Sequence, residues 1–413
     1  MRPDAIVLFD DDAAAAFQPF SATRPAGELR FGALTMRERV SAVFAAPCIG
    51  HSTGSMLAGW DEPGAPPAIE AGAVPADRTI LWWCSRGVPA WGSTLDDVSS
   101  PTLLLAGDEA VGWLAPAGSA SPPAAFLAAP AQYAAQQQHR DAPRQVLGGG
   151  VLDHVWQLVT RNAAQLADDI VHAPGAASPD LPSHVAGIGA SGGRLRVGRD
   201  VNFEPNVVLD CTDGPIWFDD GVRVRAFTRI AGPAYFGRAT TVLGGSFTAV
   251  SVGPACKVRG EIEETVILGY ANKAHDGFLG HAYVGSWVNL GALTTNSDLK
   301  NNYGTVRIRT GAGEVDTGEM KIGCFLGDHV KTAIGTLLTT GTVVGPGANL
   351  FGAGQPPRYV RPFAWGSSGG ALHEFARFID TARLVMRRRG VELTPGVEAV
   401  LRRAWNATAG IVP

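Results

Sequence analysis

The chain has 413 residues, enough for about two to three domains, and its 46% hydrophobic and 17% charged residues are typical of a globular protein. A formal net charge of −4 argues against a nucleic-acid partner, because such proteins usually carry a basic footprint. The five cysteines lie far apart in the sequence, which indicates neither a disulfide framework nor a zinc site. We therefore expect buried free thiols and a reducing, cytoplasmic location.

Residues 1–145 alternate apolar runs with one clear helical pattern, which predicts a three-layer α/β domain. The expected strands cover residues 5–9, 79–84, 102–106 and 112–115. A helix is predicted over residues 35–44, where Thr35 and Glu38 have the spacing of a capping box. The first apolar run is too short for a signal sequence, and no run reaches the ~18 apolar residues of a membrane span, so we expect no membrane partner.

The segment after the first predicted strand carries candidate phosphate and metal ligands. Arg24 and Arg30 lie where α/β sheets usually bind ligands, and guanidinium groups there could grip a phosphate. Surface salt bridges with Glu28 and Glu38 are an equally open interpretation. Asp10 begins a run of three aspartates that could hold Mg²⁺, although a solvated turn is the simpler explanation. The sequence contains no Walker A or dinucleotide-binding motif.

Three segments are predicted to connect or close larger units. Residues 116–130 are rich in Ala, Pro and Ser and are expected to form a loop. Residues 146–184 form a connector, in which apolar residues between 152 and 170 follow helical spacing. Residues 356–413 begin with prolines and predict one or two helices, with a cluster of arginines at the end of the first.

Residues 185–355 repeat with a period of six, which fits neither a helix nor an isolated strand. Such a hexapeptide repeat predicts a parallel β-helix, a rigid prism in which every sixth side chain points into the coil. The predicted inward rows are Ile216, Val222, Thr228, Ala234 and Thr240; Phe278, Val284 and Leu290; and Leu326, Thr332, Leu338, Val344 and Leu350.

The rhythm of the repeat breaks over residues 264–277 and 294–321, where polar residues concentrate. Insertions from a β-helix often form its binding face. His275 is the strongest candidate for a general base, because an imidazole with a pKa near 6.5 is largely neutral in the cytoplasm. Asp298 or Asp328 could orient it. The structural alternative for this region is a ladder of stacked asparagines inside the coil.

Several strings in the chain resemble a known family. They are LFDD, PFSATRPAGELRFGALTMRER, GYANKAHDGFLG, VGSWVNLGA, SDLKNNYG and GTVVGPGANLFG. The strings resemble bacterial sugar nucleotidyltransferase/acetyltransferase proteins related to bifunctional glucosamine-1-phosphate acetyltransferase/N-acetylglucosamine-1-phosphate uridylyltransferase, in particular a divergent branch with a short N-terminal domain. The resemblance spans most of residues 5–365 and is most specific from 268 to 304.

This resemblance implies a left-handed β-helix that forms homotrimers and binds acetyl-CoA and an amino-sugar phosphate between subunits. It also implies that His275 is the catalytic base and that Asn289 is a second catalytic residue. The residues that the resemblance places at the sugar phosphate are Lys273, Arg259, Arg307, Asn302 and Tyr303.

The implied function has two parts. The β-helix would transfer acetyl from acetyl-CoA to an amino sugar. The N-terminal domain would join a nucleoside triphosphate to a sugar 1-phosphate, giving a nucleotide sugar such as UDP-N-acetylglucosamine, with Mg²⁺ bridging phosphates near Arg24 and Arg30. Of the classical nucleotide-binding signature, only Thr23-Arg24-Pro25 is present. An acyltransferase with a degenerate N-terminal domain is therefore an alternative, as is a non-catalytic trimer that binds nucleotide sugars.

Overall fold

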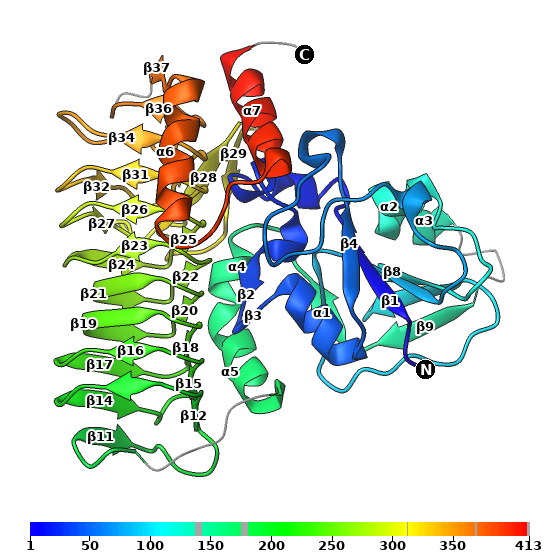
Figure 1. Ribbon diagram of the computed structural model, residues 1–413, viewed down its shortest axis with the longest axis horizontal. Helices are drawn as coiled ribbons and strands as arrows, with labels where there is room; N and C mark the ends of the chain where they lie inside the picture. Colours follow the sequence, from blue (N-terminus) through cyan, green and yellow to red (C-terminus); the bar gives the residue numbers. More distant parts are fainter. Residues whose placement is uncertain (137–142, 175–180, 312, 368–369, 411–413) are drawn as a thin grey trace.

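The computed structural model describes residues 1–136, 143–174, 181–311, 313–367 and 370–410, which form two parts that lie side by side (Figure 1). The N-terminal part is a layered α/β domain, and the second part is a long parallel β-helix with two helices at its end. The predicted combination of an α/β domain with a β-helix is therefore confirmed. No helix in these ranges is long and apolar enough to cross a membrane.

The N-terminal sheet has six strands in the order β4-β1-β5-β8-β7-β9. Their bounds are β1 Ala5–Phe9, β4 Cys48–Ser52, β5 Ile80–Cys84, β7 Thr102–Ala106, β8 Glu109–Ala115 and β9 Arg144–Leu147. Strand β1 is fully buried and runs parallel to both β4 and β5, while β8 is antiparallel to β5 and β7. The carboxyl ends of β1, β4 and β5 therefore meet at one edge of the sheet, the usual ligand position in such folds.

Helix α1 (Met36–Phe44) begins as predicted. The Thr35 hydroxyl accepts a hydrogen bond from Glu38 N at 3.1 Å, and the Glu38 carboxylate accepts one from Thr35 N at 2.8 Å. Two small antiparallel pairs accompany the sheet, β2 (Arg30–Phe31) with β3 (Leu34–Thr35), and β6 (Gly87–Pro89) with β10 (Gly149–Val151). Short 3₁₀ turns cover Ala14–Ala16, Phe20–Ala22, Ala26–Glu28, Ser55–Leu57 and Ala71–Ala73.

The loop predicted over residues 116–130 is wrong in part, because helices α2 (Ala124–Ala128) and α3 (Pro130–Gln136) begin there. The buried ring of Phe126 packs against Phe9 and Trp113, which anchors α2 on the sheet. The predicted connector helix is divided at Arg161 into α4 (Gln157–Thr160) and α5 (Asn162–His172).

The β-helix stacks about ten turns whose strands pair in parallel. Strands of its larger sheet are β11 Val185–Ile188, β13 Asn202–Phe203, β14 Val207–Asp210, β16 Arg223–Val224, β17 Thr228–Ala231, β19 Thr241–Thr248, β21 Lys257–Glu263, β23 Asn272–Lys273, β24 Phe278–Gly280, β26 Asn289–Leu290, β31 Lys331–Thr332, β34 Asn349–Leu350, β36 Ala364–Trp365 and β37 Ala371–Leu372. The second sheet contains β12 Leu195–Val197, β15 Ile216–Phe218, β18 Ala234–Phe236, β20 Ser251–Val252, β22 Val266–Ile267, β25 Tyr283–Val284, β30 Cys324–Leu326, β33 Thr342–Val344 and β35 Tyr359–Val360. A third face holds the pair β27 Thr295–Asn296 and β32 Leu337–Leu338.

The six-residue rows point into the coil as predicted, since every member of the first and third rows is at most 6% exposed. Phe278 is the exception. It is half-buried, and its neighbour Leu279 takes the inward place. This difference arises because the coil changes length just before β24, which moves the inward position by one residue.

The insertion after β27 folds as a hairpin of β28 (Arg307–Thr310) and β29 (Gly313–Asp316). Parallel pairing continues past residue 355, the predicted end of the repeats, through β35 and β36. Helix α6 (Phe375–Arg387) then lies along the last coils, and α7 (Pro395–Ala409) lies between the β-helix and the N-terminal domain (Figure 1).

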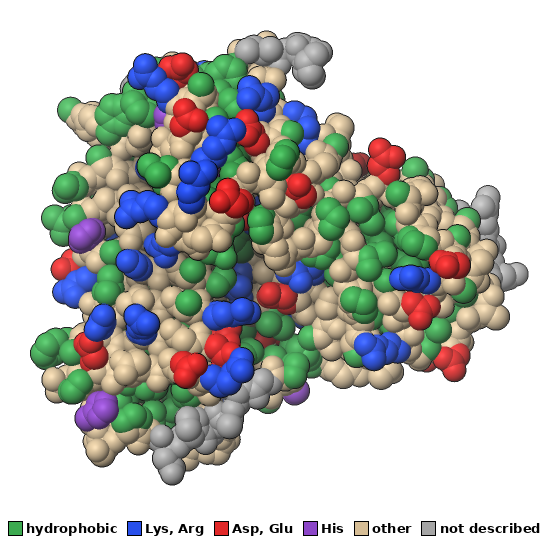
Figure 2. Space-filling model, viewed as in Figure 1, with side chains coloured by type: hydrophobic (Ala, Val, Ile, Leu, Met, Phe, Trp, Pro, Cys, Tyr) green, Lys and Arg blue, Asp and Glu red, His purple; other side chains and the backbone are tan. Residues whose placement is uncertain are grey.

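Hydrophobic side chains line the edge of the β-helix that is farthest from the N-terminal domain (Figure 2). Large apolar residues stand exposed at turns between strands of the β-helix, with Phe227 and Ile334 both 78% exposed and Leu293 59% exposed.

Candidate functional site

The polar residues at the carboxyl ends of β1 and β5 are already paired with protein groups. Asp10 accepts hydrogen bonds from the Ser85 hydroxyl at 2.6 Å and from Ala26 N at 3.2 Å. Asp11 forms an ion pair with Arg86 at 2.7 Å. Burial raises the pKa of Asp10, which disfavours the charged form that a cation requires.

These aspartates do not fit a magnesium ion, because Mg²⁺ needs carboxylate oxygens that are free to coordinate it. Among the residues that the structure describes, no three His, Cys, Asp or Glu side chains form a group that could hold a metal. The geometry thus gives no support to Asp10 as a metal ligand.

Arg24 lies at the junction of the N-terminal domain and the β-helix, between two carboxylates. Its Nη1 is 2.9 Å from Glu62 Oε2, and its Nε is 2.9 Å from Asp328 Oδ2. Burial alone would lower the pKa of Arg24, but the charges of Asp328 and Glu62 raise it instead. Arg24 therefore binds two protein carboxylates here rather than facing an open phosphate site, and Asp328 is not available to orient His275.

Arg30 is buried at the same junction, where it contacts two tyrosines of the β-helix. The guanidinium donates to Ala33 O, and Cζ lies 5.2 Å from the centre of the Tyr235 ring. The Tyr283 hydroxyl accepts from Arg30 N at 2.8 Å and donates to Arg30 O at 3.0 Å. Both arginines predicted to grip phosphate thus belong to the surface that joins the two parts of the molecule.

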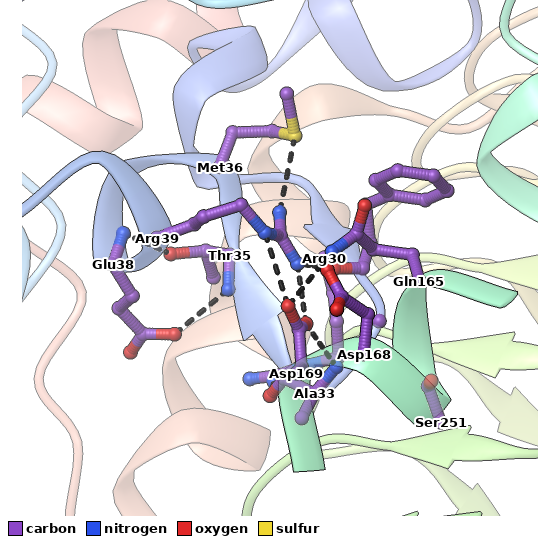
Figure 3. A network of polar contacts seen from close by, with 12 residues as sticks. Arg30, Ala33, Thr35, Met36, Glu38, Arg39, Gln165, Asp168, Asp169 and Ser251 are labelled. Carbon is purple, nitrogen blue, oxygen red and sulfur yellow. Dashed lines mark hydrogen bonds and ion pairs between the residues drawn. The ribbon is translucent and has the colours of Figure 1, made fainter. Parts of the chain in front are cut away.

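A buried polar network around Arg39 and Asp169 fixes this junction (Figure 3). The two charged side chains have no exposed surface, and Arg39 Nε lies 3.2 Å from Asp169 Oδ1. Asn162 on α5 accepts from Gly32 N at 2.8 Å and donates to Ser251 Oγ, on the β-helix, at 3.1 Å. The network connects the β2–β3 hairpin, α5 and the β-helix, so its role is structural.

A cavity of about 540 Å³ lies beyond the carboxyl end of β5. One wall consists of β6 and β10, and the other of α4, α5 and the ring of Phe31. Arg161, Gln165 and Asp168 bring polar groups to it. This cavity has room for a small polar ligand and lies near the edge of the sheet where ligands are expected.

His275 lies at a corner of the β-helix that has three residues in its own coil and one residue in the preceding coil, so that its corner overhangs the one below. Strand pairing shows that this corner consists of residues 225–227 in one coil, 243–244 in the next, Arg259 alone in the third, and 274–276 in the fourth. The imidazole is exposed above this step. Asp276 beside it forms an ion pair with Arg259 at 2.9 Å, so Arg259 supports the corner from below.

A column of three glycines, Gly245, Gly260 and Gly277, runs beside the step. Their φ angles of +112°, +103° and +129° favour glycine, and a Cβ at Gly277 would lie 2.4 Å from Thr294 O. The three glycines line an open hollow of about 410 Å³. Its remaining lining residues are Ser246, Glu261, Asp276 and Phe278.

Asn289 is exposed on β26 and is oriented by Asn272, its partner in the preceding coil. Asn272 Nδ2 donates to Asn289 Oδ1 at 2.8 Å, which leaves Asn289 Nδ2 to donate to a group outside the chain. Lys331 and Asn349 occupy the same position in the next two coils. Asn272 and Asn289 therefore stack outside the coil, whereas Asn296 is buried and bonds to Gly280 N and Gly280 O, both at 2.9 Å.

Lys273 points into the coil and is 1% exposed. Its ammonium donates to Arg259 O at 3.1 Å and to His275 O. The predicted contact between Lys273 and a sugar does not agree with this enclosed position.

The insertion carries the other predicted sugar ligands on its surface. Tyr303 is 69% exposed, and the Asn302 side chain accepts from Gly304 N at 3.1 Å. Arg307 Nε lies 3.6 Å from Asp316 Oδ2. Within the described ranges of one subunit, no hydrogen bond or ion pair joins these three side chains to His275.

Sequence reasoning missed a second histidine, His281, which lies one six-residue repeat after His275. His281 Nδ1 is 2.8 Å from Asp298 Oδ2, and its Nε2 is 3.5 Å from Glu264 Oε2. Burial raises the pKa of Asp298, but the hydrogen bond and charge of His281 outweigh this effect and lower it. Asp298 therefore orients His281 rather than His275.

Comparison with known proteins gives a match to one family model and to two bifunctional relatives. Residues 6–173 match the family model described as sugar nucleotidyl transferase. A bifunctional sugar-1-phosphate nucleotidylyltransferase/acetyltransferase from Sulfurisphaera tokodaii is 28% identical over 91 residues, which are 22% of this chain and 23% of the relative. The bifunctional protein GlmU of Stenotrophomonas maltophilia is 33% identical over 169 residues, or 36% of each chain.

The chain thus matches less than half of the length of these curated relatives. The family model ends at residue 173, before the first strand of the β-helix at Val185. These matches confirm the predicted resemblance: residues 6–173 match the family model of sugar nucleotidyl transferases, and a parallel β-helix follows them.

Proposed function

We propose that this protein is a transferase whose β-helix moves an acetyl group from acetyl-CoA to the amine of an amino sugar or its phosphate. The observation that carries the proposal is the exposed His275 at a corner beside a glycine-lined hollow, with the outward amide of Asn289 in the next coil. The word acetyltransferase in the name of the Sulfurisphaera relative supports the same reaction.

In this reaction the amine nitrogen attacks the thioester carbonyl carbon while His275 accepts a proton from that nitrogen. Asn289 Nδ2 donates to the oxyanion of the tetrahedral intermediate, a contribution of up to a few kcal/mol. The carbon–sulfur bond then breaks, and the thiolate of coenzyme A takes the proton from the imidazolium. The products are an amide and a free thiol.

The sugar-binding side of this site is incomplete in one subunit, since Asn302, Tyr303 and Arg307 make no polar contact with the His275 corner. A homotrimer would bring the insertion of one subunit to the corner of another, as the family resemblance implies. The exposed apolar residues at the turns of the β-helix support self-association (Figure 2).

We also propose a cytoplasmic location, which the five free cysteines support.

The substitution His275→Ala tests the base. We expect release of free thiol from acetyl-CoA to fall about 10²–10⁴-fold, the usual contribution of a general base, with an unchanged KM for acetyl-CoA. His172→Ala, at an exposed histidine of α5, is the matched control and should keep the wild-type rate. Wild-type turnover in the His275 variant, or no thiol release by the native protein with any amino sugar, sugar phosphate or nucleotide sugar, would overturn the proposal.

A second candidate function belongs to the N-terminal domain, because the family model covers it. We propose that the cavity beside Arg161 binds a nucleotide sugar, with UDP-N-acetylglucosamine as the first to test, and that the domain forms it from a nucleoside triphosphate and a sugar 1-phosphate. The measurement is pyrophosphate release across the four triphosphates, with and without Mg²⁺. Release that Arg161→Ala lowers supports catalysis in this cavity.

If no pyrophosphate appears, calorimetry with UDP-N-acetylglucosamine separates the remaining alternatives. Binding that Arg161→Ala weakens indicates a nucleotide-sugar-binding module. The absence of binding indicates a degenerate domain that serves the acyltransferase only as a structural partner.

A further inference from the structure

Lys273 occupies a position that neighbouring coils fill with aliphatic side chains. Strand pairing places it next to Val258 in the preceding coil, and the pairing of Asn272 with Asn289 places Leu290 above it. Val242 continues the same row below. An ammonium in such a row is costly, because burial in an apolar environment disfavours a charge, and it lowers the pKa of Lys273 to about 8.

The ammonium lies at the step where the corner of the β-helix changes length. Below the step the corner is Arg259 alone, and above it the corner is residues 274–276. Nζ donates to the carbonyl oxygens of Arg259 and His275, one on each side of the step. A buried carbonyl without a donor is costly, and an aliphatic residue at this position would leave both carbonyl oxygens without the donor that Lys273 supplies.

From these contacts we infer that Lys273 is a positioning residue for His275: it holds the overhanging corner from inside the coil and so fixes where the imidazole stands beside the hollow. Lys273 does not touch the substrate. Its effect reaches the reaction through the backbone of His275, while the ion pair of Asp276 with Arg259 holds the same corner from outside.

This inference rests on the proposed acyl transfer, so its test needs a readout that does not depend on turnover. Hydrogen exchange of the amides of residues 274–278, measured by mass spectrometry on the full chain, reports the corner directly. Lys273→Met is the test variant, because methionine has a similar length and suits an apolar row. Leu290→Met is the matched control, since it changes the same row one coil away without touching the corner.

We expect Lys273→Met to speed exchange at residues 274–278 at least tenfold and to lower kcat for acyl transfer about 10- to 100-fold, the scale of a displaced catalytic group, with KM within twofold. Leu290→Met should leave both quantities at wild-type values. Lys273→Gln, which retains an N–H donor, should give intermediate exchange and activity, and it takes the place of the methionine variant if that protein does not fold.

Equal exchange in the Lys273 and Leu290 variants would overturn the inference, as would a fall in kcat with unchanged exchange. If the native protein releases no thiol from acetyl-CoA, the acyl-transfer proposal fails, and the exchange data alone then decide whether Lys273 holds the corner. The two failures are therefore distinguishable.

Discussion

Glu28 shows what pairing with two partners does to a buried acid. Its carboxylate lies 2.5 Å from Arg37 Nε and 2.8 Å from His51 Nε2, and it is only 7% exposed. Burial raises the pKa of Glu28, but the hydrogen bond with His51 and the charge of Arg37 outweigh burial and lower it to about 2. The ionised form is therefore the one that stabilises the folded domain.

The substitution Glu28→Gln should remove stability that depends on pH. Because the folded pKa lies below the ordinary 4.5, the contribution is complete above pH 4.5 and is lost as the pH falls toward 2. We expect the variant to be less stable by roughly 3 kcal/mol at pH 7, with the difference shrinking steadily in acid. Urea unfolding between pH 3 and 7 measures it, with the exposed Glu109→Gln as control. A difference that is constant across this range would contradict the assignment.

Individual residues also show how far the sequence could reach. His275 was identifiable because it stands in a polar string that interrupts a regular repeat, and the structure places it in an exposed corner. The sequence did not reveal that Lys273 points into the coil, because its direction depends on the lengths of the coils before and after it. The partners of Arg24 were also out of reach, since Asp328 lies 304 residues further along the chain.

At the scale of elements, the glycine column lines the hollow beside His275, and its members are not equivalent to ordinary loop glycines. A Cβ at Gly277 would meet Thr294 O at 2.4 Å, whereas one at Gly313, in the β28–β29 hairpin, would meet nothing within 4 Å. Their φ angles, +129° and +136°, are almost equal. The two positions thus share the cost of a left-handed backbone and differ in packing.

We expect Gly313→Ala to cost about 1–3 kcal/mol, the strain of an L-residue in this region, and Gly277→Ala to cost clearly more because the coils must also separate. Thermal unfolding of both variants measures the contrast. A loss of acyl transfer in Gly277→Ala alone would accompany it, since separating the coils displaces the corner that carries His275. Equal destabilisation by the two substitutions would contradict this expectation, because it would mean that the stacked coils can separate at Gly277 without a cost in free energy.

The elements that the sequence predicted are those with an uninterrupted pattern. The inward rows of the β-helix and the capped start of α1 follow from periodicity and from the spacing of Thr35 and Glu38. Helices α2 and α3 were missed, because a segment rich in alanine, proline and serine has no apolar stripe, and α2 gains its place from Phe126 packing on the sheet. Tertiary contacts, which a local pattern does not contain, decide such elements.

At the scale of the whole molecule, the N-terminal domain and the β-helix share one apolar core. Phe20, Leu29 and Trp156 from the first part pack in the same cluster as Tyr283 and Phe325 from the second. The loop that follows β1, where a ligand was expected, has become the contact surface. The two parts should therefore unfold together, as one cooperative unit.

Arg24 is the charge at this junction on which that cooperativity depends most directly. Arg24→Met leaves the carboxylates of Glu62 and Asp328 buried without their cation, a loss of about 3–5 kcal/mol for a broken buried pair. We expect urea unfolding, followed by tryptophan fluorescence and circular dichroism, to separate into two transitions, with the N-terminal domain unfolding first. Arg229→Met, which removes the exposed partner of Asp210 on the β-helix, is the matched control and should cost under about 1 kcal/mol. A single transition at the midpoint of that control would mean that the apolar core alone joins the two parts, because the buried ion pair would then add nothing to their coupling.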